Sequence, residues 1–180
     1  SFLFIFKRLS YINYFYIIFY MRTAFLQPNQ LITLNDYPMH SDSKLKDYFH
    51  KCKLGDALPY VPVLQKTLVK RHFDAALLQT FAAFEHTHPE AQYFMLDGSH
   101  RTTAATLTHC KISIVIYETT ADILAAKKLV ATGRLLASDT LNHTLEENCS
   151  ILNRHFLEKP YFMTVQQKTE KMIADHHLPS

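Results

Sequence analysis

Residues 93–107 read YFMLDGSHRTTAATL, the stretch that says most about how this chain folds. Its first four residues are mostly apolar, as in a short buried strand, and Asp97-Gly98 is a pair that commonly ends strands in a turn. Ser99 is a residue type favoured at helix N-caps, and the residues after it predict a helix over 100–108. The stretch therefore predicts a strand that passes through a glycine turn directly into a helix.

Strands and helices alternate on both sides of this stretch. The β-branched run ISIVIYE at residues 112–118 admits little besides a strand. The other predicted strands lie at 31–34 and within the proline-containing segment 58–69, and the predicted helices lie at 43–54, 73–86, 121–136, 140–156 and 164–175. Thr119 or Thr120 is the expected cap of the first C-terminal helix, and Ser138 that of the second. We expect an α+β fold, a small mixed β-sheet with packed helices plus a helical C-terminal part.

The length of 180 residues suits one domain, or one domain with an appendage. We expect a domain over residues 21–120 and a helical extension over residues 121–180. Residues 1–20 hold nine of the 23 Phe and Tyr residues, and we interpret them as a product of upstream in-frame translation before Met21. A membrane-associating aromatic segment is the alternative, although Lys7-Arg8 leaves an apolar run too short to span a bilayer.

The distribution of charge argues against a dedicated nucleic-acid binder. The formal net charge is +3, with ten Lys and Arg against nine Asp and Glu in residues 21–120, and seven against seven in residues 121–180. No segment forms a basic arm, so DNA is a weakly supported partner. The three cysteines are scattered and form no C-x-x-C pair, which indicates reduced thiols without disulfide partners in a cytoplasmic protein.

The turn at residues 97–101, hereafter the DGSHR turn, combines several groups that favour an anion. A helix N-terminus exposes unpaired backbone N–H groups and carries a partial positive charge, and Gly98 lets a ligand approach the backbone closely. Arg101 offers a fork that suits phosphate oxygens, and His100 can donate to an anion or move a proton near neutral pH. Further hydroxyl donors come from Ser99, Thr102 and Thr103. Together these residues predict a phosphate site.

Asp97 fits a phosphate site only if a cation or a substrate hydroxyl is present as well. With Mg²⁺ it becomes a candidate metal ligand, and beside a hydroxyl it becomes a candidate general base. The alternative is purely structural: Asp97-Gly98 is a β-turn, Ser99 a cap, Arg101 a surface residue and His100 a packed one. That alternative accounts for any one of these residues, whereas their clustering within five positions favours a site.

The segment LDGSHRTTAATL resembles the signature of the ParB/sulfiredoxin superfamily, in which an apolar strand leads into D-G-x-H-R and a helix rich in small residues. The order of the elements is also similar, and the resemblance covers about residues 25–118. It implies a small mixed sheet with helices and a glycine-to-arginine turn that binds nucleotide phosphates. The implied phosphate contacts come from Gly98, Ser99, His100 and Arg101, with Thr102 and Thr103 close behind.

Three branches of this superfamily differ in what they imply. Sulfiredoxins carry a catalytic cysteine where this chain has Ser99, which argues against thiol-based repair. Partition proteins add a helix-turn-helix domain, for which the charge-neutral residues 121–180 are a poor match. Free-serine kinases carry D-G-H-H-R, which differs from the DGSHR turn only at Ser99, and use an early acidic residue as base. Asp47 and Asp56 are the candidates for that role, and a solvated loop position for Asp56 is the favoured alternative.

These observations predict a nucleotide-binding protein that uses the DGSHR turn, with Mg²⁺ and a nucleoside di- or triphosphate. If it is catalytic, we expect phosphate transfer to a small hydroxyl substrate, or nucleotide hydrolysis. Asp97 would then act as metal ligand or base, with His100 and Arg101 stabilising the transferred group and Asp56 a further candidate. The alternatives are a non-catalytic, DNA-associated or partition-like regulatory module and a ParB-like nuclease. The sequence does not specify the nucleotide base, the acceptor or the oligomeric state.

Overall fold

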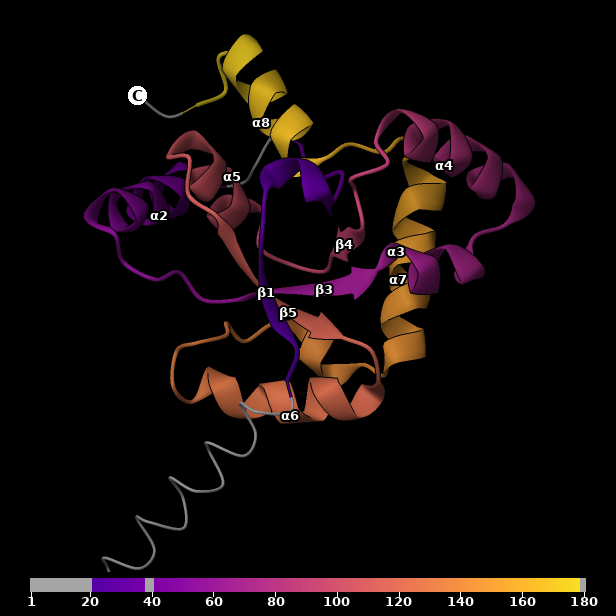
Figure 1. The fold of residues 1–180 in the computed structure, drawn as a ribbon, viewed down its shortest axis with the longest axis horizontal. Coiled ribbons are helices and arrows are strands. Elements are labelled where there is room, and N and C mark those ends of the chain that lie inside the picture. Colours follow the sequence, from indigo (N-terminus) through magenta and orange to yellow (C-terminus); the bar gives the residue numbers. More distant parts are fainter. Residues whose placement is uncertain (1–20, 38–40, 179–180) are drawn as a thin grey trace, which may run out of the picture.

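The computed structural model describes residues 21–37 and 41–178, so the interpretation of residues 1–20 lies outside the described residues. Within this part, five strands form one mixed sheet in the order β1-β5-β3-β4-β2 (Figure 1). The strands are β1 (Thr23–Leu26), β2 (Leu31–Ile32), β3 (Val61–Gln65), β4 (Tyr93–Met95) and β5 (Ile112–Tyr117). The central strand β3 is parallel to β5 and antiparallel to β4. The outer pairs are antiparallel for β1 with β5 and parallel for β2 with β4.

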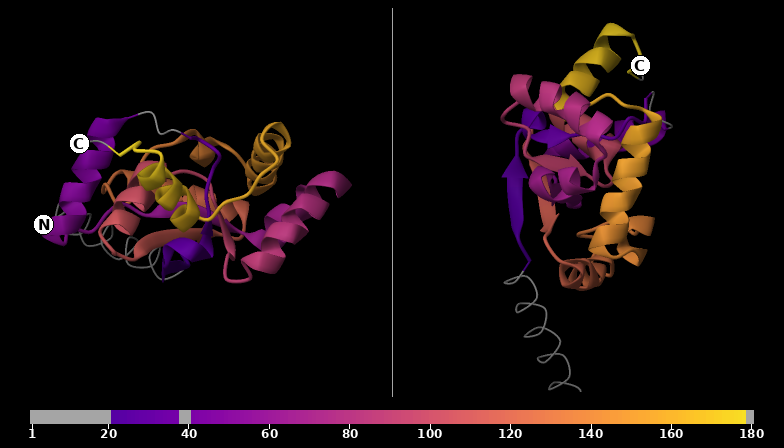
Figure 2. Two further views of the ribbon diagram at one scale, coloured as in Figure 1. Left: turned by 90° about the horizontal axis from the view of Figure 1, so that it is seen from above. Right: turned by 90° about the vertical axis from the view of Figure 1, so that its right-hand side faces the viewer.

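Helices cover both faces of the sheet (Figures 1 and 2). The α-helices are α2 (Asp42–Leu54), α3 (Lys66–Val69), α4 (Ala75–Thr87), α5 (Ser99–Leu107), α6 (Thr120–Val130), α7 (Leu145–Glu158) and α8 (Val165–Ala174). Short 3₁₀ segments lie at Pro28–Gln30, Lys70–His72 and Asp139–Asn142. This mixture of helices and one mixed sheet confirms the predicted α+β class.

Alternation along the strands divides the core into two clusters. Val63 and Met95 pack with apolar side chains of α2, α5 and α8 on one face. Leu64 and Phe94, their neighbours in sequence, pack with α3, α4, α6 and α7 on the other face. Successive side chains of a strand point to opposite faces, so a buried sheet needs helices on both sides. The DGSHR turn leads from β4 into α5, so it belongs to the face that α2, α5 and α8 cover.

The C-terminal residues complete both clusters. Phe156 and Phe162 pack against Phe73, Phe81 and Phe94, with ring centroids as close as 4.7 Å between Phe156 and Phe162. On the opposite face, side chains of α8 join the cluster around β3 and β4. The helical part after residue 120 therefore packs on the same sheet as the strands before it.

The structure differs from the sequence-based prediction in two segments, α3 and β1. Residues 66–69 were expected to be extended, but they form the short helix α3 directly after β3. The strand β1 was not predicted, since only Leu26 of its four residues is buried and its conformation depends on pairing with β5. In both cases contacts distant in sequence outweigh the local preference.

The C-terminal helices begin and end at other residues than predicted. The helix expected over 140–156 is split into a 3₁₀ segment and α7, whose cap is Thr144 rather than Ser138. The Thr144 hydroxyl accepts from the Glu147 N–H while the Glu147 carboxylate accepts from the Thr144 N–H, a reciprocal capping box. The preceding helix α6, capped by Thr119 as expected, ends at Val130 rather than at 136.

The helices were also compared with the length needed to cross a bilayer. Across residues 21–37 and 41–178, none of them combines enough length with enough apolar character to form a transmembrane span.

Candidate functional site

The DGSHR turn depends on the backbone conformation of Gly98. The sheet extends one residue beyond β4, since the Leu96 N–H donates to the Pro62 carbonyl at 3.0 Å. Gly98 then has φ of +121°, and a Cβ added there would lie 3.1 Å from Val61 Cγ2 and 3.2 Å from an Arg101 guanidinium nitrogen. Both the positive φ and the close neighbours require the absence of a side chain.

The N-cap of α5 is Gly98, not Ser99 as predicted. The Thr102 N–H donates to the Gly98 carbonyl at 2.9 Å, which makes Gly98 the N-cap and Ser99 the first residue of α5. Because Gly98 has no side chain, the N-cap offers no side-chain oxygen to the N–H groups of the first turn. Within the described part of the chain, the backbone N–H groups of Ser99, His100 and Arg101 have no acceptor. The N-terminus of α5 thus presents three donors and the positive end of the helix dipole.

The Arg101 side chain is buried and is engaged by the protein itself. It is 3% exposed, and its guanidinium donates to the carbonyls of Tyr60 at 2.5 Å and Pro59 at 3.3 Å. It also pairs with the Asp97 carboxylate at 3.0 Å. Burial lowers the pKa of Arg101, and the charge of Asp97 opposes that shift. The guanidinium therefore ties the turn to the segment before β3, so a phosphate contact from Arg101 would involve its backbone N–H.

His100 lies beside charged groups from three other segments of the chain. Burial lowers its pKa, and the nearby positive charges of Lys44 and Lys168 lower it further, while Asp36 and Asp97 oppose them. Its Nε2 atom is buried and has no hydrogen-bond partner among the described residues. A buried ring nitrogen without a partner is costly in a finished structure, and a bound ligand is one way of satisfying it.

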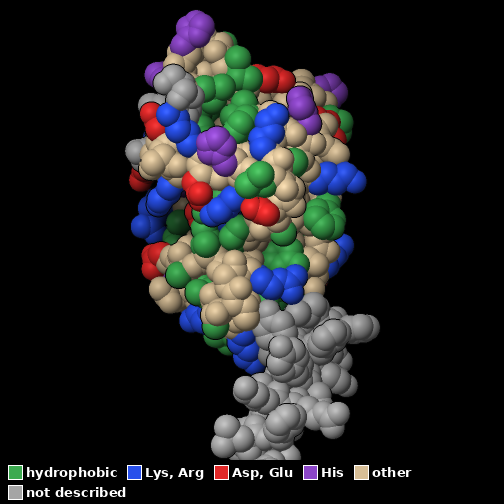
Figure 3. Space-filling view, turned by 90° about the vertical axis from the view of Figure 1, so that its left-hand side faces the viewer, with side chains coloured by type: hydrophobic (Ala, Val, Ile, Leu, Met, Phe, Trp, Pro, Cys, Tyr) green, Lys and Arg blue, Asp and Glu red, His purple; other side chains and the backbone are tan. Residues whose placement is uncertain are grey.

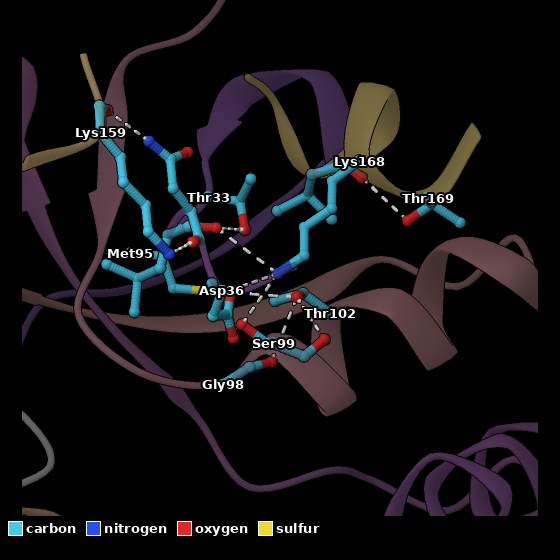
Figure 4. Close-up of polar contacts among 12 residues, drawn as sticks. Thr33, Asp36, Met95, Gly98, Ser99, Thr102, Lys159, Lys168 and Thr169 are labelled. Carbon is cyan, nitrogen blue, oxygen red and sulfur yellow. Dashed lines mark hydrogen bonds and ion pairs between the residues drawn. The ribbon is translucent and has the colours of Figure 1, made fainter. Parts of the chain in front are cut away.

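A buried lysine lies within hydrogen-bonding distance of Ser99 (Figure 4). Lys168, on α8, is 1% exposed and forms an ion pair with Asp36. Its ammonium also donates to Ser99 Oγ at 3.3 Å and to the Leu34 carbonyl at 3.5 Å. We call Asp36, Ser99 and Lys168 the lysine cluster. It joins the loop after β2, the DGSHR turn and the C-terminal helix.

The C-terminal part also fixes the loop that carries Asp36. The Asn35 side-chain amide donates to the carbonyls of Lys159 at 2.9 Å and Tyr161 at 2.8 Å. The Asn35 N–H donates to His155 Nε2 at 2.9 Å, and Lys159 Nζ donates to the Asn35 carbonyl at 2.9 Å. These four bonds place Asp36 where it meets Lys168.

The bond from Asn35 to His155 predicts a loss of stability in acid. Burial lowers the pKa of His155 below its ordinary value of 6.5, and the charge of Lys159 lowers it further. The Asn35 N–H needs the same neutral ring, because Nε2 can accept a hydrogen bond only when it carries no proton. The unfolded chain then binds the proton more readily, so this contribution is present above pH 6.5 and is lost as the pH falls from there through the lower, folded pKa. We expect the melting temperature Tm to fall between pH 7.5 and pH 5.5.

In His155→Gln the side-chain oxygen can still accept the Asn35 N–H but does not titrate, so this variant should show a smaller fall in Tm. His100, whose pKa is also lowered, remains in the variant and accounts for the rest of the fall. Equal losses of Tm in the variant and the original protein would contradict this assignment.

Three more predicted residues lie in α5 or in the turn before it. The Thr102 hydroxyl donates back to the Gly98 and Ser99 carbonyls, both at 3.1 Å, so it serves the first turn of α5. Thr103 is buried in the same helix. Asp97 remains 43% exposed on its side chain and belongs to the turn itself.

The two early acidic candidates do not lie beside His100. Asp47 pairs with Lys51 at 2.7 Å on the exposed side of α2. Asp56 lines a cavity of about 420 Å³ whose wall also includes Arg101, Ala105 and Phe25. The early carboxylate whose charge does act on His100 is Asp36. The sequence predicted Asp36 only as part of the turn cluster after the first strand.

Lys168 was missed for a different reason. Its core-facing position in α8 follows the buried Val165 and precedes the buried Met172. A lysine on the apolar stripe of an amphipathic helix was the available signal, and its partners are 69 and 132 residues away in sequence.

Magnesium was tested against the residues present. Over residues 21–37 and 41–178, no group of three or more His, Cys, Asp and Glu could hold a metal ion by itself. Mg²⁺ bound with a nucleotide needs only one or two protein carboxylates, because phosphates and waters fill its other positions. Asp97 fits that requirement, since its Oδ1 has no partner within the described residues and its side chain is partly exposed.

Charged side chains on the α2 side of the molecule are mixed in sign (Figure 3). Lys and Arg alternate there with Asp and Glu, and the part of this face that is described shows no broad patch of one charge. The positive character of the candidate site is therefore local. Comparisons with family models, with curated proteins and with solved structures found no match for this chain.

Proposed function

We propose that this protein binds the phosphates of a nucleotide at the N-terminus of α5, as its resemblance to the ParB/sulfiredoxin superfamily implies. The observation that carries the proposal is the helix start at Gly98, where three backbone N–H groups have no acceptor among the described residues. A helix N-terminus with a glycine cap suits a phosphate, because the backbone can approach its oxygens closely.

The charges around the turn support an anionic ligand. Lys44, Lys168 and Arg101 bring three positive charges, against two negative charges on Asp36 and Asp97. Two of the cations are paired, whereas Lys44 is exposed on the first turn of α2. A local surplus of positive charge raises the affinity for phosphate without the broad basic surface of a nucleic-acid binder.

If the protein is catalytic, phosphate transfer or hydrolysis is the reaction class that the site supports best. Mg²⁺, held by Asp97 and the nucleotide, would neutralise charge on the phosphates when bound. His100 would donate to the transferred group or hold a proton beside it, since its lowered pKa keeps the ring neutral near pH 7. Asp36 pairs with Lys168 through one carboxylate oxygen, so its other oxygen would accept from a small hydroxyl substrate. Asp56, which lines a cavity with Arg101, is a further candidate. We propose a reduced, cytoplasmic setting from the scattered cysteines.

A thermal-shift titration tests nucleotide binding. We expect at least one of ATP, ADP, CTP and GTP, with Mg²⁺, to raise Tm, because a ligand at 100 times its Kd adds about 2.7 kcal/mol to the free energy of unfolding. His100→Asn should reduce the shift in Tm. The matched control is His109→Asn, an exposed position just beyond the other end of α5, which should leave the shift unchanged. A protein whose Tm does not respond to any of the four nucleotides does not have the proposed function.

A further inference from the structure

Lys168 occupies a position where an apolar residue would be expected. Its neighbours on the same face of α8, Val165 and Met172, are each 1% exposed and belong to the hydrophobic cluster of that face. Removing an ammonium from water is costly, and a single ion pair often fails to recover that cost. Burial accordingly lowers the pKa of Lys168, although Asp36 opposes the shift. The charge at this position therefore calls for a role other than packing.

The three donors of the Lys168 ammonium have three acceptors, of which two lie at long distance. An ammonium has three donors, and only the contact with Asp36 is short. The contacts with Ser99 Oγ and the Leu34 carbonyl, at 3.3 and 3.5 Å, are longer than the usual range of about 2.7–3.2 Å for N–H···O bonds. The residue after Ser99 is His100, whose buried Nε2 has no partner within the described residues and whose pKa the charge of Lys168 lowers.

The contact with Ser99 determines what that hydroxyl can do. Ser99 is 7% exposed, and its Oγ accepts a hydrogen bond from the Lys168 ammonium. A serine hydroxyl has one proton to donate, and an ammonium can only donate. Lys168 therefore occupies a lone pair of Ser99 Oγ and leaves the Ser99 proton free for another acceptor. A phosphate oxygen at the N-terminus of α5 is an acceptor of that kind.

We propose that Lys168 is a positioning residue of the phosphate site, and that it orients the Ser99 hydroxyl as a donor to a phosphate oxygen while its charge attracts the anion. Asp36 holds the ammonium in place, and its side chain, 29% exposed, marks the edge where the lysine cluster meets solvent. This inference rests on the proposed function. It adds that the site requires α8, whose Lys168 lies 69 residues after Ser99.

The test removes the charge without leaving an unpaired partner. Lys168→Met combined with Asp36→Asn deletes both members of the buried ion pair, so a merely structural role predicts unchanged affinity for pyrophosphate in the folded variant. The proposal instead predicts affinity weaker by about tenfold, the usual value of one charge-assisted hydrogen bond. The matched control is Lys171→Met with Asp175→Asn, an exposed ion pair at 2.7 Å on the same helix, which should not change the affinity.

Calorimetric titration with magnesium pyrophosphate, together with Tm for each variant, separates the outcomes. Ser99→Ala should weaken binding as well. Adding Ser99→Ala to the Lys168→Met/Asp36→Asn variant should weaken binding by less than it does in the original protein, because part of the effect of Lys168 passes through Ser99. If the Lys168→Met/Asp36→Asn variant bound pyrophosphate as tightly as the original protein, the proposed role of Lys168 would be overturned, while the phosphate site would stand. A lack of binding by the original protein to pyrophosphate and to all four nucleotides would remove the phosphate site itself.

Discussion

Replacing Arg101 with methionine is expected to lower the free energy of unfolding by about 3 kcal/mol, since a buried charged donor is lost. The methionine fills much of the volume of the arginine stem but leaves the Tyr60 and Pro59 carbonyls without their donor. It also leaves the Asp97 carboxylate without its cation. Urea unfolding followed by circular dichroism measures the change directly.

The matched control for this variant is Arg71→Met, at an exposed arginine in the 3₁₀ segment after α3. We expect a change within about 0.5 kcal/mol there, as is usual for surface positions. If Arg101→Met were as stable as this control, Arg101 would not be the link between the DGSHR turn and the segment before β3.

Gly98→Ala is the second substitution with a large expected effect, a loss of about 3 kcal/mol in the free energy of unfolding. A φ of +121° is strained for any residue with a side chain, and the new Cβ would lie 3.1 Å from Val61 Cγ2. It would also lie 3.2 Å from the Arg101 guanidinium, which is held by the two carbonyls and cannot easily move. Because the turn must shift, nucleotide binding should weaken as well.

Gly133→Ala provides the comparison for this strain. Gly133 also has a positive φ, +69°, but its added Cβ would meet nothing within 4 Å. A left-handed alanine costs about 1 kcal/mol, so Gly133→Ala should be clearly less destabilising than Gly98→Ala. Equal losses in the two variants would mean that the contacts of Gly98 with Val61 and Arg101 do not matter.

Much of the fold follows from patterns that are local in sequence. The helix predicted over 43–54 is observed as α2 (Asp42–Leu54), because its apolar spacing and the glycine at position 55 mark its face and its end. The β-branched run at 112–118 gives β5 in the same way. In contrast, β1 is short and mostly unburied, so its existence depends on pairing with a strand about 90 residues away.

The residues of the candidate site likewise fall into those that local sequence identifies and those that only the fold brings together. Asp97, Gly98 and His100 are adjacent in sequence, so a single motif identifies them. The motif could not show that the Arg101 guanidinium bonds to the Pro59 and Tyr60 carbonyls, because that contact joins segments about 40 residues apart. Asp36 and Lys168, separated by 132 residues, are brought together only by the packing of α8.

Backbone amide NMR during a titration with magnesium pyrophosphate tests the central claim most directly. We expect the largest chemical-shift changes at the N–H signals of Ser99, His100 and Arg101, because these groups would donate to the phosphate oxygens. Smaller changes should follow in the loop that carries Asp36 and in α8. Saturable shifts centred elsewhere, for instance on the cavity beside Asp56, or no shift at these three amides, would contradict a phosphate site at the start of α5.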